Sequence, residues 1–248
     1  MINYRLPKSW EDLERKVAQI LSEAGLKTIV EKDISAARGF TNVDVFAIDE
    51  NQSPKVTYIC ECKYWKRKVS MDAVKSLRTT VVDYGANYGI IISKNGFQQG
   101  AVEWVNKTNI CLVDWFEFQE MFEDKWWKNI CAKLYAEFDT LINYADVTPL
   151  EFRTKKWKRI ENDETKCAKF AWLLKEYQEI GYDLMGLGME GFGGLSKKPT
   201  FPITMKIPDP QTSRKTIQID SLRDYVDFLV FHGQRGLKAF AELFGEAV

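Results

Sequence analysis

The stretch VTYICECK, residues Val56–Lys63, joins an apolar run to a charged end. Its first part is rich in β-branched and aromatic side chains and predicts a strand. Glu61 and Lys63 close the stretch two positions apart, so their side chains are expected on one face of that strand. Because a carboxylate in apolar surroundings needs a cation or a hydrogen-bond donor, this strand end is a candidate functional site.

A second acid, Asp44, lies in the neighbouring apolar run Val43–Ile48. The short polar connection at 49–54 favours a hairpin, which places the two runs side by side. Two carboxylates on adjacent strands can share one divalent cation such as Mg²⁺, with the backbone carbonyl of Cys62 as a candidate further ligand. Such an ion polarises a phosphate oxygen and lowers the pKa of a bound water, while the Lys63 ammonium could orient that water or stabilise charge in the transition state. This combination is what a metal-dependent phosphodiester hydrolase needs.

The other elements of the first half follow from periodicity and from end signals. Ser9 begins a predicted helix that Gly25 ends. Short links between the first three strands predict antiparallel pairing, and helical crossovers predict parallel pairing afterwards. The predicted fold class is therefore α/β, a mixed sheet with helices on both faces. We expect strands at 26–34, 43–48, 56–63, 88–93 and 109–114, helices at 70–84 and 98–107, and a turn or loop at 36–41.

The pattern changes after about residue 115, and the second part is predicted to be α-rich with one β-hairpin. The glycine-rich segment 181–194 is expected to be a mobile loop. The hairpin is expected around Pro208-Asp209-Pro210. We predict one domain at 1–124 and a helical C-terminal region of unassigned role at 125–248. The expected helices are a long amphipathic one from Trp126 to Ile142, then Glu164–Ile180, Ser221–Phe231 and Gly236–Phe244.

Composition excludes several classes of function. The chain has 248 residues, 35 basic and 35 acidic, so a nucleic-acid contact must come from a local patch rather than from overall charge. The single histidine, His232, argues against a histidine triad or a multi-histidine zinc site. The five cysteines form no paired motif, which favours reduced thiols and a cytoplasmic protein. No signal peptide and no membrane-spanning run is recognised, so no membrane partner is expected.

The strand with Asp44, followed by the strand with Glu61-Cys62-Lys63, then a helix and a strand, resembles the PD-(D/E)xK nuclease superfamily, and within it the Mrr-like restriction endonuclease domain. The resemblance covers roughly residues 9–115. It includes Leu13-Glu14 on the first helix, the glycine-containing approach to Asp44 at 38–44, and the segment at 91–101. The family often has Gln where this chain has Glu61, but Glu is the usual ligand in the superfamily.

This resemblance implies a restriction-endonuclease-like fold and Mg²⁺-dependent cleavage of DNA, with Mn²⁺ able to substitute. Asp44 and Glu61 would then be metal ligands, Lys63 the catalytic lysine and Glu14 an assisting acid. A single site cuts one strand, so double-strand cleavage implies a homodimer or a higher homo-oligomer. A role in restriction or antiviral defence, and a partner protein from a defence system, are implied only by the resemblance.

Basic residues near the predicted site are candidates for phosphate contacts. Such contacts bind DNA without reading its sequence, although the same residues could form a solvated turn. Tyr64 and Trp65 could stack against DNA, and core packing explains them equally well. Two other functions stay open: a non-catalytic nucleic-acid-binding or assembly module on the same fold, and a DNA repair or junction-resolving nuclease. The basic candidates are Arg38, Lys66, Arg67 and Lys68.

Overall fold

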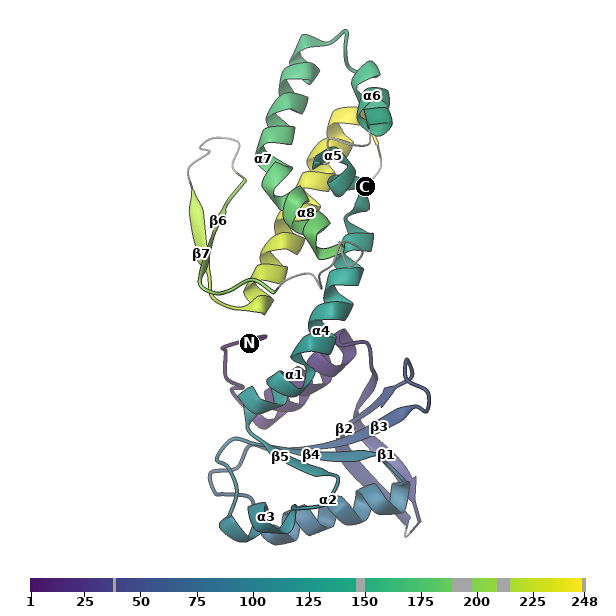
Figure 1. Cartoon of the computed structure of the whole chain (residues 1–248), viewed down its shortest axis with the longest axis vertical. Helices are drawn as coiled ribbons and strands as arrows, with labels where there is room; N and C mark the ends of the chain where they lie inside the picture. The colour runs from purple at the N-terminus through teal and green to yellow at the C-terminus, as the bar shows by residue number, and fades with distance from the viewer. Residues whose placement is uncertain (38, 146–149, 189–197, 209–214, 247–248) are drawn as a thin grey trace. The chain divides into compact units, whose positions relative to one another are not determined.

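The computed structural model describes residues 1–37, 39–145, 150–188, 198–208 and 215–246 (Figure 1). The chain forms two compact units, Met1–Asn129 and Ile130–Val248. Helix α4, Trp115–Glu137, begins in the first unit and ends in the second, so a boundary at residue 124 falls inside a helix. No helix in the described parts is both long enough and apolar enough to cross a membrane.

The first unit is built on a five-stranded sheet in the order β1-β2-β3-β4-β5. The pairs β1–β2 and β2–β3 are antiparallel, and β3–β4 and β4–β5 are parallel, which confirms the predicted mixed sheet. The strands are β1 (Lys27–Ala36), β2 (Gly39–Asp49), β3 (Val56–Lys63), β4 (Tyr88–Ser93) and β5 (Ile110–Val113).

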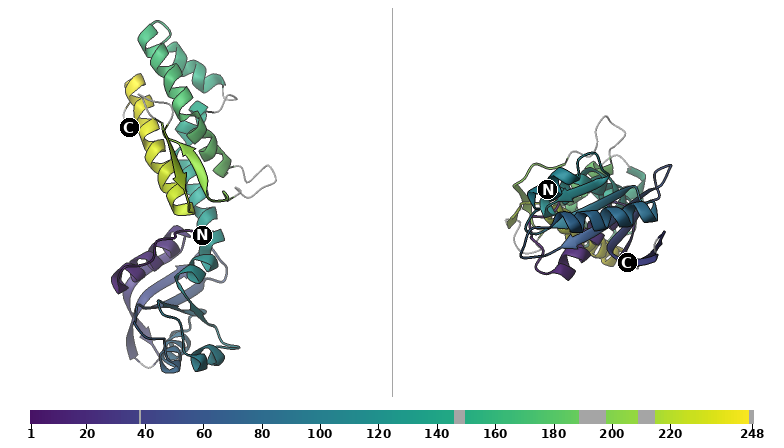
Figure 2. Two further views of the ribbon diagram at one scale, coloured as in Figure 1. Left: turned by 90° about the vertical axis from the view of Figure 1, so that its left-hand side faces the viewer. Right: turned by 90° about the horizontal axis from the view of Figure 1, so that it is seen from below.

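Helices cover both faces of this sheet. Helix α1 (Trp10–Glu23) lies on one side, and α2 (Met71–Tyr84) and α3 (Gln99–Trp104) lie on the other (Figures 1 and 2). The Ser9 side chain caps α1 by accepting from the Asp12 backbone N–H at 3.2 Å, as the sequence predicts. The start of α4 packs beside α1, where the Trp126 indole N–H donates to Glu23 at 2.7 Å.

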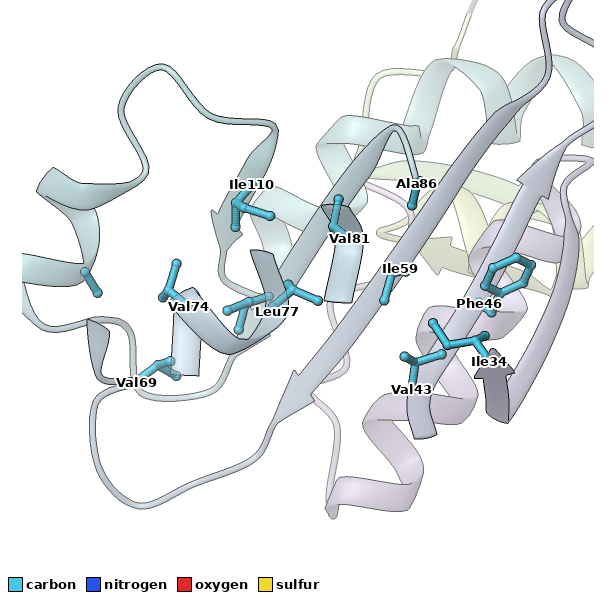
Figure 3. Close-up of a cluster of buried hydrophobic side chains, with 12 residues drawn as sticks. Ile34, Val43, Phe46, Ile59, Val69, Val74, Leu77, Val81, Ala86 and Ile110 are labelled. Atoms are coloured by element: carbon cyan, nitrogen blue, oxygen red, sulfur yellow. The ribbon is translucent and has the colours of Figure 1, made fainter. Parts of the chain in front are cut away.

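An apolar core cluster fills the space between the sheet and α2 and α3 (Figure 3). Buried β-branched and aliphatic side chains from the strands interlock there with one face of α2. Burial of this kind is the dominant favourable contribution to folding. The cluster contains Ile34, Val43, Phe46, Ile59, Val69, Val74, Leu77, Val81, Ala86, Ile91, Ala101 and Ile110.

The turn or loop predicted at 36–41 is too long. Strands β1 and β2 form a long hairpin whose ladder continues to the pair Ala36 and Gly39. A glycine stands where the second strand begins, and its φ of +124° is a conformation that other residues rarely adopt. The turn is therefore much shorter than composition indicates. Residue 38 lies outside the described residues.

The second unit is mainly helical and contains the predicted hairpin. Strand β6 (Ile203–Lys206) pairs antiparallel with β7 (Thr216–Ile219). Asp209 and Pro210 of the predicted turn lie outside the described residues. The helices that lie wholly in this unit are α5 (Asp139–Ala145), α6 (Leu150–Lys158), α7 (Glu164–Gly188) and α8 (Leu222–Phe244).

The helix predicted from Trp126 to Ile142 begins earlier and is divided at Phe138. Asp114 caps its start, because the Asp114 carboxylate accepts from the backbone N–H groups of Phe116 and Glu117 at 2.8 and 2.9 Å. Helical hydrogen bonding continues across the division, since the Phe138 N–H donates to Leu134 and its carbonyl accepts from Ile142. Asp114 is therefore a helix cap and not the last residue of the strand predicted at 109–114.

Two predictions about glycines in this unit are wrong. Helix α7 continues through the first part of the expected mobile loop and ends at Gly188, while 189–194 lie outside the described residues. Helix α8 is continuous where two helices were expected. The reason is close packing: a Cβ at Gly181 would overlap that of Ala145, and one at Gly233 would lie 2.7 Å from the Phe138 ring. These glycines allow close approach of neighbouring helices rather than flexibility.

Replacing Gly181 by alanine is therefore expected to destabilise the protein by about 1–3 kcal/mol, because the added methyl group overpacks the contact with Ala145. The matched control is Gly186→Ala on the same helix, where a Cβ meets open space. That change should be neutral or stabilising by up to about 1 kcal/mol, since alanine favours helix more than glycine does. Urea denaturation measures both free energies of unfolding, and equal effects of the two changes would contradict the packing explanation.

Candidate active site

Asp44, Glu61 and Lys63 meet at one edge of the sheet in the first unit. The pairing of Val45 with Cys60 makes Asp44 and Glu61 the next residues along β2 and β3. The Lys63 ammonium forms an ion pair with the Glu61 carboxylate and lies 3.7 Å from the Asp44 carboxylate. The three side chains are only 18–23% exposed. The structure thus brings together the three residues on which the sequence-based hypothesis rests.

Backbone contacts hold this arrangement in place. The Asp44 carboxylate accepts from the backbone N–H of Cys62 at 2.6 Å, which ties β2 to the end of β3. On its other side β3 pairs with β4, and the Lys94 N–H donates to the Lys63 carbonyl at 3.0 Å. Because Cys60 and Cys62 are buried next to the acids, the apolar side of β3 is anchored in the sheet while its polar side forms the site.

Electrostatic interactions among the two carboxylates and the lysine shift the pKa values of Glu61 and Lys63. Burial, and next to it the negative charge of Asp44, raises the pKa of Glu61, and the Lys63 ammonium opposes this change. Burial alone would lower the pKa of Lys63, but its acidic neighbours outweigh that effect and the pKa is raised. A protonated lysine therefore stands between two acids that repel each other. An additional cation at this edge would relieve the repulsion.

Glu14 reaches the same group of charges from α1. Its side chain is buried, at 6% exposure. Burial, followed by the charges of Asp44 and Glu31, raises its pKa to about 7, against an opposing effect of Lys63. Glu14 is thus a carboxyl group that gains or loses its proton near neutral pH, next to the other three predicted residues.

Glu31 on β1 is a further acid near these charges, and it is not among the residues predicted from the sequence. It lies between the paired positions Val30–Val45 and Lys32–Val43, and therefore opposite Asp44. Its φ of 48° interrupts the regular strand, and its charge contributes to the raised pKa of Glu14. The available signal was the poor alternation of the stretch at 26–34, which marks an irregular strand without showing what faces it.

Three of the predicted phosphate-binding residues follow Lys63 within five positions of the sequence. Lys66, Arg67 and Lys68 are exposed beyond the end of β3. The Arg67 guanidinium lies 5.4 Å from the centre of the Trp65 ring, and Lys63 lies 5.5 Å from the same ring. Arg38 lies outside the described residues.

The donor set fits a cation that needs few protein ligands. Within the described ranges, no group of three or more His, Cys, Asp or Glu residues is placed to hold a metal ion. Mg²⁺ is commonly bound by one or two carboxylates with several waters, so Asp44 and Glu61 meet its requirement. Burial and, after it, the negative charge of Asp44 raise the pKa of Glu61, and both effects favour a cation beside this carboxylate.

The perturbed Glu14 leads to a test of this electrostatic arrangement. Without added metal, the protein is expected to lose stability as the pH rises from about 4.5 to about 7, because the folded state holds the Glu14 proton longer than the unfolded chain does. One such group contributes at most about 1.4 kcal/mol per pH unit. Glu14→Gln should remove this part of the slope, as measured by urea denaturation across the pH range.

The control for this experiment is Glu120→Gln, which changes an exposed glutamate on α4. This variant should keep the wild-type dependence of stability on pH. If Glu14→Gln and wild type instead gave parallel curves, Glu14 would not carry the raised pKa.

Comparison with known proteins bears on this site. Residues 7–122 match the family model described as "Restriction endonuclease" (Mrr_cat). This segment is a restriction endonuclease domain of that family. It contains the whole five-stranded sheet and all four residues of the site.

Two solved structures resemble parts of the chain. A crystal structure of AF1548, a protein of unknown function, is 19% identical with a TM-score of 0.38, covering 43% of this chain and 59% of that one. The DNA modification-dependent restriction endonuclease AspBHI is 14% identical with a TM-score of 0.29, covering 48% of this chain and 38% of that one. Each of the two matches covers less than two thirds of this chain and less than two thirds of the other chain. No curated protein matches the sequence.

Proposed function

We propose that this protein is an endonuclease that hydrolyses phosphodiester bonds of DNA with the help of a divalent metal, Mg²⁺, for which Mn²⁺ substitutes. The observation that carries the proposal is the meeting of Asp44, Glu61 and Lys63 at the end of β3. That meeting occurs inside a restriction endonuclease domain, a class whose substrate is DNA.

Each residue has a proposed role. Asp44 and Glu61 hold the metal, together with the backbone carbonyl of Cys62. When bound, the ion supplies Lewis-acid polarisation of a phosphate oxygen. The Lys63 ammonium, which is protonated and close to both acids, orients the attacking water and stabilises the negative charge that develops on the phosphate. Glu14 accepts a proton at its carboxylate, for which a pKa of about 7 is suited.

The DNA backbone is proposed to contact the basic residues predicted from the sequence: Lys66, Arg67 and Lys68, which are exposed, and Arg38. These contacts position the duplex without reading its sequence, so binding should weaken steeply with salt. Strand β3 ends at Lys63, three residues before Lys66, and this short separation supports contact of the basic stretch with a phosphate bound near Lys63.

The wider biological role belongs to the same proposal. Cleavage of both strands would require a homodimer or a higher homo-oligomer, because one site cuts one strand. The region from about residue 125 would recognise DNA, mediate assembly or receive a signal from a defence-system partner. Restriction or anti-phage defence in the cytoplasm is the proposed setting, in keeping with five free cysteines.

The deciding experiment incubates the full chain with supercoiled plasmid and Mg²⁺, Mn²⁺ or EDTA. We expect conversion to nicked or linear DNA with either metal and none with EDTA. DNA binding without cleavage under all metal conditions would overturn the proposal in favour of a non-catalytic binding module. A comparison of linear with branched DNA separates restriction from repair, since a junction-resolving nuclease would cut the branched substrate much faster.

A further inference from the structure

Strands β1 and β2 extend past the candidate active site as a two-stranded arm. Strand β2 pairs with β1 from Gly39 onwards, whereas its pairing with β3 begins at Val45. The arm, residues 31–37 and 39–44, therefore includes Asp44 of the site and leads away from it. Phe40 lies near the far end of the arm, where β2 begins.

One face of the arm is fixed against α2. Ile34 and Val43, one from each strand, are buried in the apolar cluster between the sheet and α2 (Figure 3). At the end of the arm, the Ala37 backbone N–H donates to the carbonyl of Asp83 on α2 at 3.1 Å. These contacts set the position of the arm relative to the catalytic residue that it carries.

The other face of the arm continues directly from the catalytic residue. Side chains alternate along a strand, so Phe40, Asn42 and Asp44 share the face opposite to that of Val43. The charge of Asp44 acts on Glu14 of α1, and α1 covers the side of the sheet opposite to α2. Phe40 therefore lies on the side of the sheet to which the Asp44 carboxylate points.

Phe40 is the most exposed large hydrophobic residue of the described ranges, at 85%. Its neighbours on this face of the arm, Ser35, Asp33 and Asn42, are polar and exposed. A single exposed apolar side chain needs no explanation by itself. What distinguishes this ring is its place on an anchored arm, on the same strand face as a residue that is proposed to act on DNA.

The spacing along the arm suits a groove of DNA. Four residues of antiparallel strand, the separation of Phe40 from Asp44, span about 14 Å. The minor groove of B-DNA is about 6 Å wide and 7.5 Å deep, so a ring at that distance from a phosphate can enter the neighbouring groove. Between the two positions lies the exposed Asp33 carboxylate, which accepts from the Asn42 amide at 2.9 Å and would repel a phosphate. A groove is therefore favoured over a backbone along the middle of the arm.

We propose that Phe40 is a wedge that enters the minor groove and inserts between two base pairs near the phosphate held at the catalytic edge. Apolar side chains that insert in this way partly unstack the base step and kink the duplex. The inference rests on the proposed function and adds to it a preference for DNA that is easily unstacked. Arg38, already proposed as a phosphate contact, is two residues from Phe40 in the sequence.

The test measures the affinity of the full chain for two short duplexes in EDTA, one fully paired and one with a single T·T mismatch. Unstacking costs less at a mismatch, so wild type should bind the second duplex about fivefold more tightly or better. Phe40→Ala should weaken binding to the mismatched duplex by about 5–100-fold, because the stacking contact is lost, and should abolish the preference. Phe40→Trp keeps a ring that can insert and should retain the preference.

Two controls make the result specific. Val82→Ala removes another exposed apolar side chain, on α2, and should keep the full preference. A 2-aminopurine base beside the mismatch fluoresces more strongly when it is unstacked. Saturating wild-type protein should therefore raise its fluorescence, and saturating Phe40→Ala should not. Because the Phe40 side chain is exposed, its removal should leave the melting temperature of the protein nearly unchanged.

Equal affinity of wild type for the two duplexes, or a preference that survives Phe40→Ala, would overturn the inference. Loss of an oligomer in Phe40→Ala, seen by sedimentation, with no change in the 2-aminopurine signal would overturn it in favour of a contact with a second copy of the chain. Wild-type protein that cuts plasmid but shows no preference would overturn the wedge and leave the nuclease proposal intact. A preference that depends on Phe40, without cleavage in any metal, would do the reverse.

Discussion

Lys63→Ala is expected to reduce the rate of DNA cleavage by about 10²–10³-fold while DNA binding stays within a few-fold of wild type. The physical reason is the position of the ammonium, which pairs with Glu61 and lies 3.7 Å from Asp44. A fixed positive charge in this half-buried site stabilises charge that develops on the phosphate, and it makes little contribution to binding of the ground state. Plasmid cleavage and fluorescence anisotropy measure the two quantities.

The Lys63 experiment has a matched control on the same strand hairpin. Lys55→Ala removes an exposed lysine whose ion pair with Glu50 contributes little, and should leave both cleavage and binding unchanged. Lys63→Arg keeps the charge but changes its shape, so partial activity is expected. Cleavage by Lys63→Ala within a few-fold of wild type would remove Lys63 from the catalytic mechanism.

Asp44→Asn is expected to reduce metal-dependent cleavage by about 10³-fold or more, because one of two carboxylate ligands is lost. The asparagine carbonyl can still accept from the Cys62 N–H, so the link between β2 and β3 is kept. The same variant should lose most of the rise in melting temperature that Mg²⁺ or Mn²⁺ produces in wild type. Thermal unfolding with and without metal measures this second effect independently of activity.

The control for this change is Asp72→Asn, an exposed aspartate in the first turn of α2. It should keep both cleavage and the metal-induced stabilisation. If Asp44→Asn were stabilised by metal as strongly as wild type, the metal would lie elsewhere on the protein. Loss of the metal effect without loss of cleavage would instead argue for a reaction that does not use this ion.

Local signals were sufficient to predict most of the first unit. Helix caps at Ser9 and Ser70, the glycine at 85 and the apolar runs of the strands act over a few residues, so they can be read from a single sequence. The same holds for Glu61 and Lys63, whose spacing of two places them together on any strand. That Asp44 stands beside them followed from the short connection between the two strands.

Longer-range packing explains the errors in the second unit. The intrinsic preference of glycine predicts flexibility at positions 181 and 233, yet both glycines lie inside helices. They are needed there because Ala145 lies too close to Gly181, and Phe138 too close to Gly233, for a larger side chain. No pattern within α7 or α8 records where those partners lie. Tertiary contacts therefore reversed a local preference of about 1 kcal/mol for each glycine.

The sequence by itself determined how consecutive strands are connected, where the capped helices begin, and which charged residues stand at the end of β3. Each of these features depends on neighbours within a few positions. Only the tertiary structure decided that Glu14 is buried with a pKa of about 7 and that Glu31 lies opposite Asp44 on the neighbouring strand. Each of these facts depends on the distance between segments that are remote in the chain. Burial and charge proximity, which set the pKa values, arise only when those segments pack together.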